Sequence, residues 1–257
     1  MMQSIGRMMA AYLSRGNPKN QSVETSALVA VLPALKRADV LLVEGNSKIS
    51  QGIKYLTQST WSHAALYIGD TLLPGSQGSP TPALIEADVH DGVRLVPVSR
   101  YSSFHTRICR PVGLSDDDVD RLIAYAMQHL GHQYDLKNII DLVRYLLPTP
   151  PVPQHWRRRM IALGSGDPTR AICSSLIAKA FQHVHYPILP DIEHIDRQDP
   201  GCIRCRDEIL HIRHHSLFTP RDFDVSSFFQ IIKPRIAAGF DPYRITWSHE
   251  PSAAPRE

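Results

Sequence analysis

The spacing of hydrophobic positions changes near residue 115, from the continuous or alternating pattern of strands to the period of helices. Before that point the pattern predicts strands at residues 39–44, 61–69, 83–87, 93–98 and 106–110, with one short helix at 47–56. Turn signals between neighbouring strands, such as Asp91-Gly92, favour an antiparallel meander. Beyond it the pattern predicts helices at 115–131, 136–147 and 170–184, then strands at 209–214 and 228–232.

These elements indicate one main domain of the α+β class. It covers residues 38–240 and carries loop insertions at 148–169 and 190–208, which are rich in polar residues and proline. A short helix and linker at residues 1–37 precede the domain, and a tail rich in proline and alanine follows at 241–257.

Cys173 stands at the leading edge of the apolar stripe of the helix predicted at 170–184. The first turn of a helix presents unpaired backbone N–H groups and the positive end of the helix dipole, which lower the pKa of a thiol and favour the nucleophilic thiolate. Burial as a small hydrophobic residue is the alternative for a lone cysteine. Ser174 and Ser175 are alternative nucleophiles, or residues that cap and pack the start of the helix.

Two strands supply the other residue types that thiol catalysis needs. Alternation in the strand at 61–69 places His63 on one face beside small alanines, where it is either a general base or a satisfied structural histidine. Glu86 interrupts an apolar strand, and a buried carboxylate needs a partner such as an imidazolium on the neighbouring strand. Asp88, on the same strand face, and Asp135 are alternatives to Glu86 as the group that orients the histidine.

The composition and charge of the chain argue against a nucleic-acid-binding protein. The chain has 257 residues, of which 43% are hydrophobic and 21% charged, and its formal net charge is +3. Basic residues do not alternate with aromatic ones along any element, so we expect no nucleic-acid partner.

Residues 1–13 lack the uninterrupted apolar core of a signal peptide, and no apolar run reaches the roughly 20 residues of a membrane span. We therefore expect a cytoplasmic protein, with peripheral membrane contact through its amphipathic start left open.

The four cysteines are too few and too unevenly spaced for a disulfide-rich domain. Cys202 and Cys205, followed by His211, His214 and His215, are the residue types of a zinc site. The spacing between Cys205 and His211 is shorter than in the usual zinc finger, so an insertion with incidental thiols is the default interpretation. We expect no metal and no cofactor.

Five separated motifs occur in one order along the chain: residues 39–45, 60–69, 85–87 with Gly92-Val93, 131–135 and 172–177. Together they resemble the YiiX/YebB-like branch of the NlpC/P60 cysteine hydrolases. The resemblance implies a circularly permuted papain-like fold, in which an antiparallel sheet or small barrel packs on helices and the nucleophile helix follows the histidine strand.

The same resemblance implies roles for individual residues: Cys173 as nucleophile, His63 as general base and Glu86 as orienter. It also implies that Tyr134 lines the site or donates to the oxyanion, and we place Ser174 beside it. We expect no export signal in this chain, and in this respect it departs from the lipoprotein members of the group.

The expected activity is hydrolysis of a peptide or isopeptide amide bond through a thioacyl intermediate on Cys173. A lipid-directed acyltransferase or thiol lipase that uses the same residues is one alternative, and a non-enzymatic binding module is a second. The expected partner is a small peptide, amide or lipid-like substrate. No motif indicates the oligomeric state or the preferred substrate.

Overall fold

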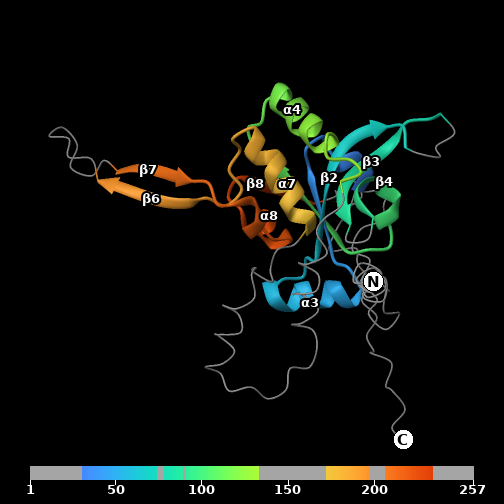
Figure 1. The fold of residues 1–257 in the computed structure, drawn as a ribbon, viewed down its shortest axis with the longest axis horizontal. Coiled ribbons are helices and arrows are strands. Elements are labelled where there is room, and N and C mark those ends of the chain that lie inside the picture. Colours follow the sequence, from blue (N-terminus) through green and yellow to red (C-terminus); the bar gives the residue numbers. More distant parts are fainter. Residues whose placement is uncertain (1–30, 74–77, 89–90, 133–171, 197–205, 234–257) are drawn as a thin grey trace, which may run out of the picture.

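The computed structural model describes residues 31–73, 78–88, 91–132, 172–196 and 206–233 (Figure 1). The helices predicted at 1–13 and 136–147 and the tail at 241–257 lie outside the described residues. None of the helices within these ranges is both long and apolar enough to cross a membrane.

A six-stranded antiparallel sheet forms the centre of the fold, with strand order β4-β3-β2-β1-β5-β8. Its strands are β1 (Val40–Val43), β2 (His63–Thr71), β3 (Thr81–Asp88), β4 (Gly92–Pro97), β5 (Thr106–Pro111) and β8 (Phe229–Ile232). The first four strands form the predicted meander, but β5 returns to pair with the free side of β1. The sheet is open. The predicted antiparallel sheet is therefore confirmed, and the alternative of a small barrel is wrong.

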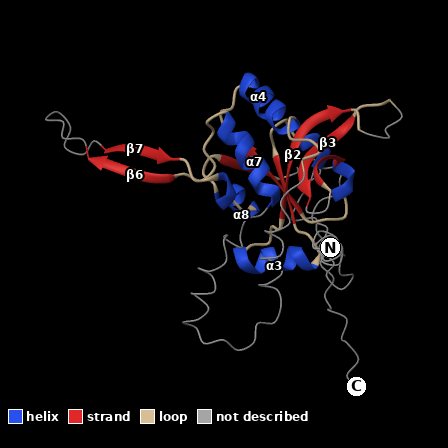
Figure 2. Cartoon of the chain, in the orientation of Figure 1, coloured by secondary structure: helices blue, strands red, loops and turns tan. Residues whose placement is uncertain are grey.

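Helices cover one face of this sheet (Figure 2). The helix α7 (Ile172–His183) lies on β2 and β3, and α4 (Asp116–Met127) packs against α7. Leu66 and Ile85 from the strands meet Leu122 of α4 and Phe181 of α7 in the main core. Burial of these large apolar side chains, each worth about 1.5–3 kcal/mol, fixes the helix layer on the sheet.

The other face carries a smaller core that is covered by the 3-10 helices η1 (Leu32–Ala34) and η2 (Val98–Tyr101) and the segments beside them. The predicted alternation of β2 is confirmed, because Ala64 and Leu66 belong to the main core and Ala65 and Tyr67 to the smaller one. His63 therefore begins β2 on the face opposite to the helices.

Two predicted helix starts are confirmed by their caps. The side chain of Ser47 accepts a hydrogen bond from the backbone N–H of Ser50 at the start of α3 (Lys48–Thr57). Ser115 accepts one in the same way from Asp118 at the start of α4. A further helix, α8 (Pro220–Val225), begins with a capping box formed by Thr219 and Asp222.

The strands β6 (Asp191–Asp196) and β7 (Arg206–His211) pair into a two-stranded ribbon that projects from the body (Figure 1). The prediction of a loop across 190–208 is therefore wrong at both of its ends, and the strand predicted at 209–214 begins earlier. An antiparallel pair satisfies backbone hydrogen bonds between its own strands, so it forms without the alternating apolar pattern of a strand in a core. The 3-10 helix η3 (His215–Leu217) follows this ribbon.

Candidate active site

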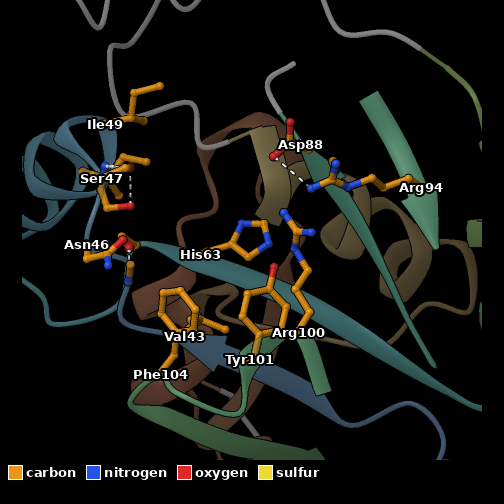
Figure 3. Close-up of a pocket in the computed structure, with 15 residues that line it drawn as sticks. Val43, Asn46, Ser47, Ile49, His63, Asp88, Arg94, Arg100, Tyr101 and Phe104 are labelled. Carbon is orange, nitrogen blue, oxygen red and sulfur yellow. Dashed lines mark hydrogen bonds and ion pairs between the residues drawn. The ribbon is translucent and has the colours of Figure 1, made fainter. Parts of the chain in front are cut away.

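A cavity of about 420 Å³ lies at one end of the sheet, where β1 and β3 end and β2 begins. The antiparallel pairing of Val43 with His63 brings the end of β1 to the start of β2. The first turn of α3 closes one side of the cavity. Its lining comprises Val43, Gly45, Asn46, Ser47, Ile49, Ser50, Ile53, Ser62, His63, Ala87, Asp88, Arg94, Arg100, Tyr101 and Phe104 (Figure 3).

His63 and Glu86 meet at this cavity, as the sequence predicted. Tyr67 pairs with Leu84 across β2 and β3, so His63 and Glu86 extend from the same face of the sheet. The distance from Nε2 of His63 to Oε2 of Glu86 is 2.9 Å. The imidazole is partly exposed to the cavity, whereas the carboxylate is 1% exposed.

Two further residues donate hydrogen bonds to the Glu86 carboxylate. Arg94, directly opposite Glu86 on β4, donates from Nε to Oε1 at 3.0 Å. Tyr101, the last residue of η2, donates its hydroxyl proton to Oε2. The sequence analysis missed both residues. The register of the hairpin around Asp91-Gly92 could have identified Arg94, but no sequence pattern indicates Tyr101.

Burial alone would raise the pKa of Glu86, but the hydrogen bonds and charges around it have a larger combined effect in the opposite direction. His63 contributes most, with Tyr101 and Arg94 next, and the pKa of Glu86 falls to about 2. Burial and the neighbouring Glu86 raise the pKa of Tyr101. The phenol therefore stays protonated as a donor, and the carboxylate stays ionised at neutral pH.

Asp88, one of the alternative orienters, pairs with Arg94 at 3.3 Å (Figure 3). Arg94 thus lies between the carboxylates of Glu86 and Asp88, and it also pairs with Asp91. The 2.9 Å contact with Nε2 of His63 belongs to Glu86, which supports Glu86 as the orienter. Asp135, the other alternative, lies outside the described residues.

Cys173 is the second residue of α7, at the helix start where the sequence placed it. Figure 1 shows α7 and β2 beginning toward the same end of the sheet, which is the end closed by α3. The side chain of Cys173 lies outside the description. Ser174 is buried and donates from Oγ to the carbonyl of Phe218 at 2.7 Å, which fits the packing alternative for this residue.

Tyr134, Cys202 and Cys205 lie outside the described residues. His211 and His214 are exposed at and after the end of β7. Among the residues that the structure describes, no three histidines, cysteines or carboxylates form a group that could hold a metal ion. The zinc site stays a prediction, because Cys202 and Cys205 lie outside the described residues.

Backbone contacts fix the rim of the cavity. Gly45 donates its N–H to Oγ of Ser62 at 2.9 Å, immediately before His63. A Cβ on Gly45 would clash with Oγ of Ser50 and would lie 2.9 Å from Oγ of Ser62, so a larger residue here would force both serine side chains to move. Trp61 donates from its indole N–H to Asp224 at 3.0 Å and thereby joins the start of β2 to α8.

A family model described as "Permuted papain-like amidase enzyme, YaeF/YiiX, C92 family" matches residues 34–145. This match includes His63 and Glu86 and ends before Cys173. The chain is 18% identical over 216 residues to the probable lipoprotein peptidase YaeF of Escherichia coli K12, with 74% of each chain covered. It is also similar to the crystal structure of metalloprotein YiiX from Escherichia coli O157:H7, at 15% identity and a TM-score of 0.45, over 78% of this chain and 97% of that one.

Proposed function

We propose that the chain is a member of the permuted papain-like YaeF/YiiX amidases, whose family model matches residues 34–145, and that it hydrolyses amide bonds through a thioacyl intermediate on Cys173. The observation that carries this proposal is the 2.9 Å contact between His63 and the buried, ionised Glu86 at an open cavity. A carboxylate that holds one ring nitrogen fixes the tautomer and orientation of a catalytic histidine.

The contact with Glu86 assigns the proton to Nε2 of His63, so the thiol proton would pass to Nδ1. The thiolate of Cys173 then attacks the carbonyl carbon and forms a C–S bond, while the carbonyl electrons move to the oxygen. Backbone N–H groups at the start of α7 point along the helix axis and stabilise the resulting oxyanion.

The tetrahedral intermediate collapses with cleavage of the C–N bond, and the amine leaves with the proton from Nδ1. Water then attacks the thioester and gives up a proton to His63. The C–S bond breaks, the acid product leaves and the thiol is restored. In both half-reactions His63 becomes an imidazolium beside Glu86, whose ionised carboxylate stabilises it.

Arg94 and Tyr101 position the orienter. Arg94 binds Oε1 and Tyr101 binds Oε2, the oxygen that His63 also contacts, so both carboxylate oxygens are held and Glu86 cannot rotate away from Nε2. Arg94 also balances the buried negative charge of Glu86, which would otherwise cost several kcal/mol.

An ester-bearing lipid is the second candidate substrate class, and one observation favours it. The cavity wall formed by β1, α3 and Phe104 carries three aliphatic side chains, Val43, Ile49 and Ile53, beside the polar Ser47 and Ser50. An acyl chain would fit this wall, with the carbonyl directed toward His63.

Paired substrates that share one acyl group test the proposal. We would measure product release from an N-acyl peptide and from the matching acyl ester, with wild-type protein and with Cys173→Ala. We expect amide hydrolysis by the wild type and a loss of at least 1000-fold in the variant. An ester-to-amide rate ratio that exceeds the ratio expected from their intrinsic chemical reactivity would favour the lipid alternative. Equal rates in the wild type and in Cys173→Ala would exclude a thioacyl mechanism.

Cys109→Ala is the matched control. Cys109 lies in the core on β5, and burial raises the pKa of its thiol, so it is unreactive. Its replacement should leave the rate unchanged at 20 °C.

A further inference from the structure

We infer that Arg100 is a specificity residue that binds a carboxylate or another anionic group of the substrate beside the scissile amide. This inference rests on the proposed hydrolase function. Two arginines line the cavity with His63, namely Arg94 and Arg100, and they differ in how their charges are satisfied.

Arg94 is fully engaged by the protein. It pairs with Glu86, Asp88 and Asp91, and its side chain is 23% exposed. A guanidinium surrounded by three carboxylates has little remaining capacity for a substrate anion.

Arg100 has a single charged contact among the described residues, from its Nε to Oε1 of Glu86 at 4.0 Å. That distance is at the limit of an ion pair, and the same oxygen already accepts from Arg94. The side chain of Arg100 is 49% exposed, so its charge faces the open cavity. Its two terminal nitrogens thus offer a planar pair of donors, which matches a carboxylate.

The guanidinium of Arg100 also lies close to His63, the proposed general base. Figure 3 shows it beside the imidazole of His63, on the side of the cavity away from Asn46 and Ile49. Both residues contact Glu86, with His63 at Oε2 and Arg100 at Oε1. An anion held by Arg100 would therefore be close to the carbonyl that reacts next to His63.

The two sides of the cavity differ in chemistry and together define a substrate class. The side formed by β1 and α3 is uncharged and carries three aliphatic side chains, Val43, Ile49 and Ile53, beside Ser47 and Ser50, whereas Arg100 supplies a positive charge on the other. A substrate with an apolar acyl part and a carboxylate next to the amide, such as an N-acyl amino acid or the end of a peptide, fits both sides. A phosphate group shares the anionic chemistry.

Alkylation of Cys173 tests this inference without knowledge of the natural substrate. In this reaction the thiolate forms an S–C bond and expels iodide. We would compare the rate constants for iodoacetate, which is an anion, and iodoacetamide, its neutral analogue, by mass spectrometry of the tryptic peptide 171–179. In the wild type we expect a higher ratio of iodoacetate to iodoacetamide than for free glutathione.

Removal of the charge in Arg100→Gln should lower this ratio about 3- to 10-fold, because a half-exposed charged hydrogen bond is worth only part of its buried value. Arg100→Lys should keep part of the preference, since it retains the charge without the planar donors. Arg121→Gln is the matched control: this arginine is also about half exposed, pairs with Asp117 on α4, and should leave the ratio unchanged.

The outcomes separate this inference from the function on which it rests. If the reaction depends on His63 but the ratio is the same in wild type and Arg100→Gln, the role of Arg100 is overturned and the hydrolase proposal stands. If Cys173 shows no reaction that depends on His63, both fall. Protection against iodoacetamide by acetate or by inorganic phosphate, lost in Arg100→Gln, supports the anion site and identifies the preferred group.

Discussion

Glu86 is the buried carboxylate that connects the sheet to the chemistry of the cavity. Its side chain holds His63, Arg94 and Tyr101 at once, although only the histidine was expected from the sequence. The sequence predicted the pair because an acidic residue inside an apolar strand requires a partner, and His63 is the polar residue on the strand before it. The contribution of Tyr101 depends on how η2 folds back over the sheet, which no local pattern encodes.

The pKa of Glu86 makes a prediction about stability. A carboxyl whose pKa is about 4.5 in the unfolded chain and about 2 when folded stabilises the folded state above pH 4.5. This stabilisation, roughly 3 kcal/mol, is lost as the pH falls toward 2. We expect urea unfolding to show that Glu86→Gln is less stable than wild type at pH 6, with the difference shrinking toward pH 2.5. A difference that does not depend on pH would contradict the low pKa.

Tyr101→Phe isolates the hydroxyl that binds Glu86. The phenyl ring can keep its contacts with His63 and Phe104, so the fold should be retained. We expect kcat to fall about 5- to 20-fold, because Glu86 loses one of the hydrogen-bond donors that position it. The loss of this hydrogen bond should raise the activation free energy by about 1–2 kcal/mol. Loss of the hydroxyl should also raise the pKa of Glu86 toward its usual value. The acid limb of the pH–rate profile should therefore move to higher pH. An unchanged profile would assign the hydroxyl a structural role alone.

At the scale of elements, local rules predicted those parts of the fold that depend on short-range physics. The caps at Ser47 and Ser115, the hairpin at Asp91-Gly92 and the two faces of β2 all follow from periodicity and turn chemistry. The pairing of β5 with β1 was not predicted, because strand order is set by the whole core and not by neighbouring residues. The strand β6 was missed and β7 was predicted only over its last residues, because polar residues in both strands break the pattern of a core strand.

The two helix caps differ in their relation to the cavity and give a paired prediction. Loss of either cap, in Ser47→Ala or Ser115→Ala, should cost about 1 kcal/mol of unfolding free energy. Of these two helices α3 lines the cavity and α4 does not, so Ser47→Ala but not Ser115→Ala should also raise KM, by about 2- to 5-fold. Thermal melts and steady-state kinetics of both variants check this. A rise in KM for Ser115→Ala would show that the effect follows general stability.

At the scale of the whole molecule, one buried ion pair joins segments far apart in the chain. Asp39, just before β1, is fully buried and binds Arg110 of β5 through both carboxylate oxygens, at 2.8 and 2.7 Å. Arg110 also donates to the carbonyl of Ala34. Burial raises the pKa of Asp39, although the hydrogen bonds from Arg110 oppose this. The pair therefore joins the inner strands β1 and β5 of the sheet at a cost in desolvation.

This balance predicts an asymmetric double-mutant cycle. Arg110→Met leaves a buried carboxylate without its partner and should cost about 3–5 kcal/mol, whereas Asp39→Asn should cost less. The double variant should recover part of the loss of Arg110→Met, because no buried charge remains. Denaturant unfolding of the four proteins measures the coupling. Additive losses would show that the two groups do not interact.

The central claim is that His63, held by Glu86, activates the thiol of Cys173. The most direct test is the rate of Cys173 alkylation by iodoacetamide between pH 5 and 9, in wild type, His63→Ala and Glu86→Gln. We predict that the wild-type thiol reacts at least 10-fold faster than that of His63→Ala below pH 7, with Glu86→Gln between them. Identical profiles in all three proteins, each following the ordinary pKa of a free thiol near 8.5, would contradict the account.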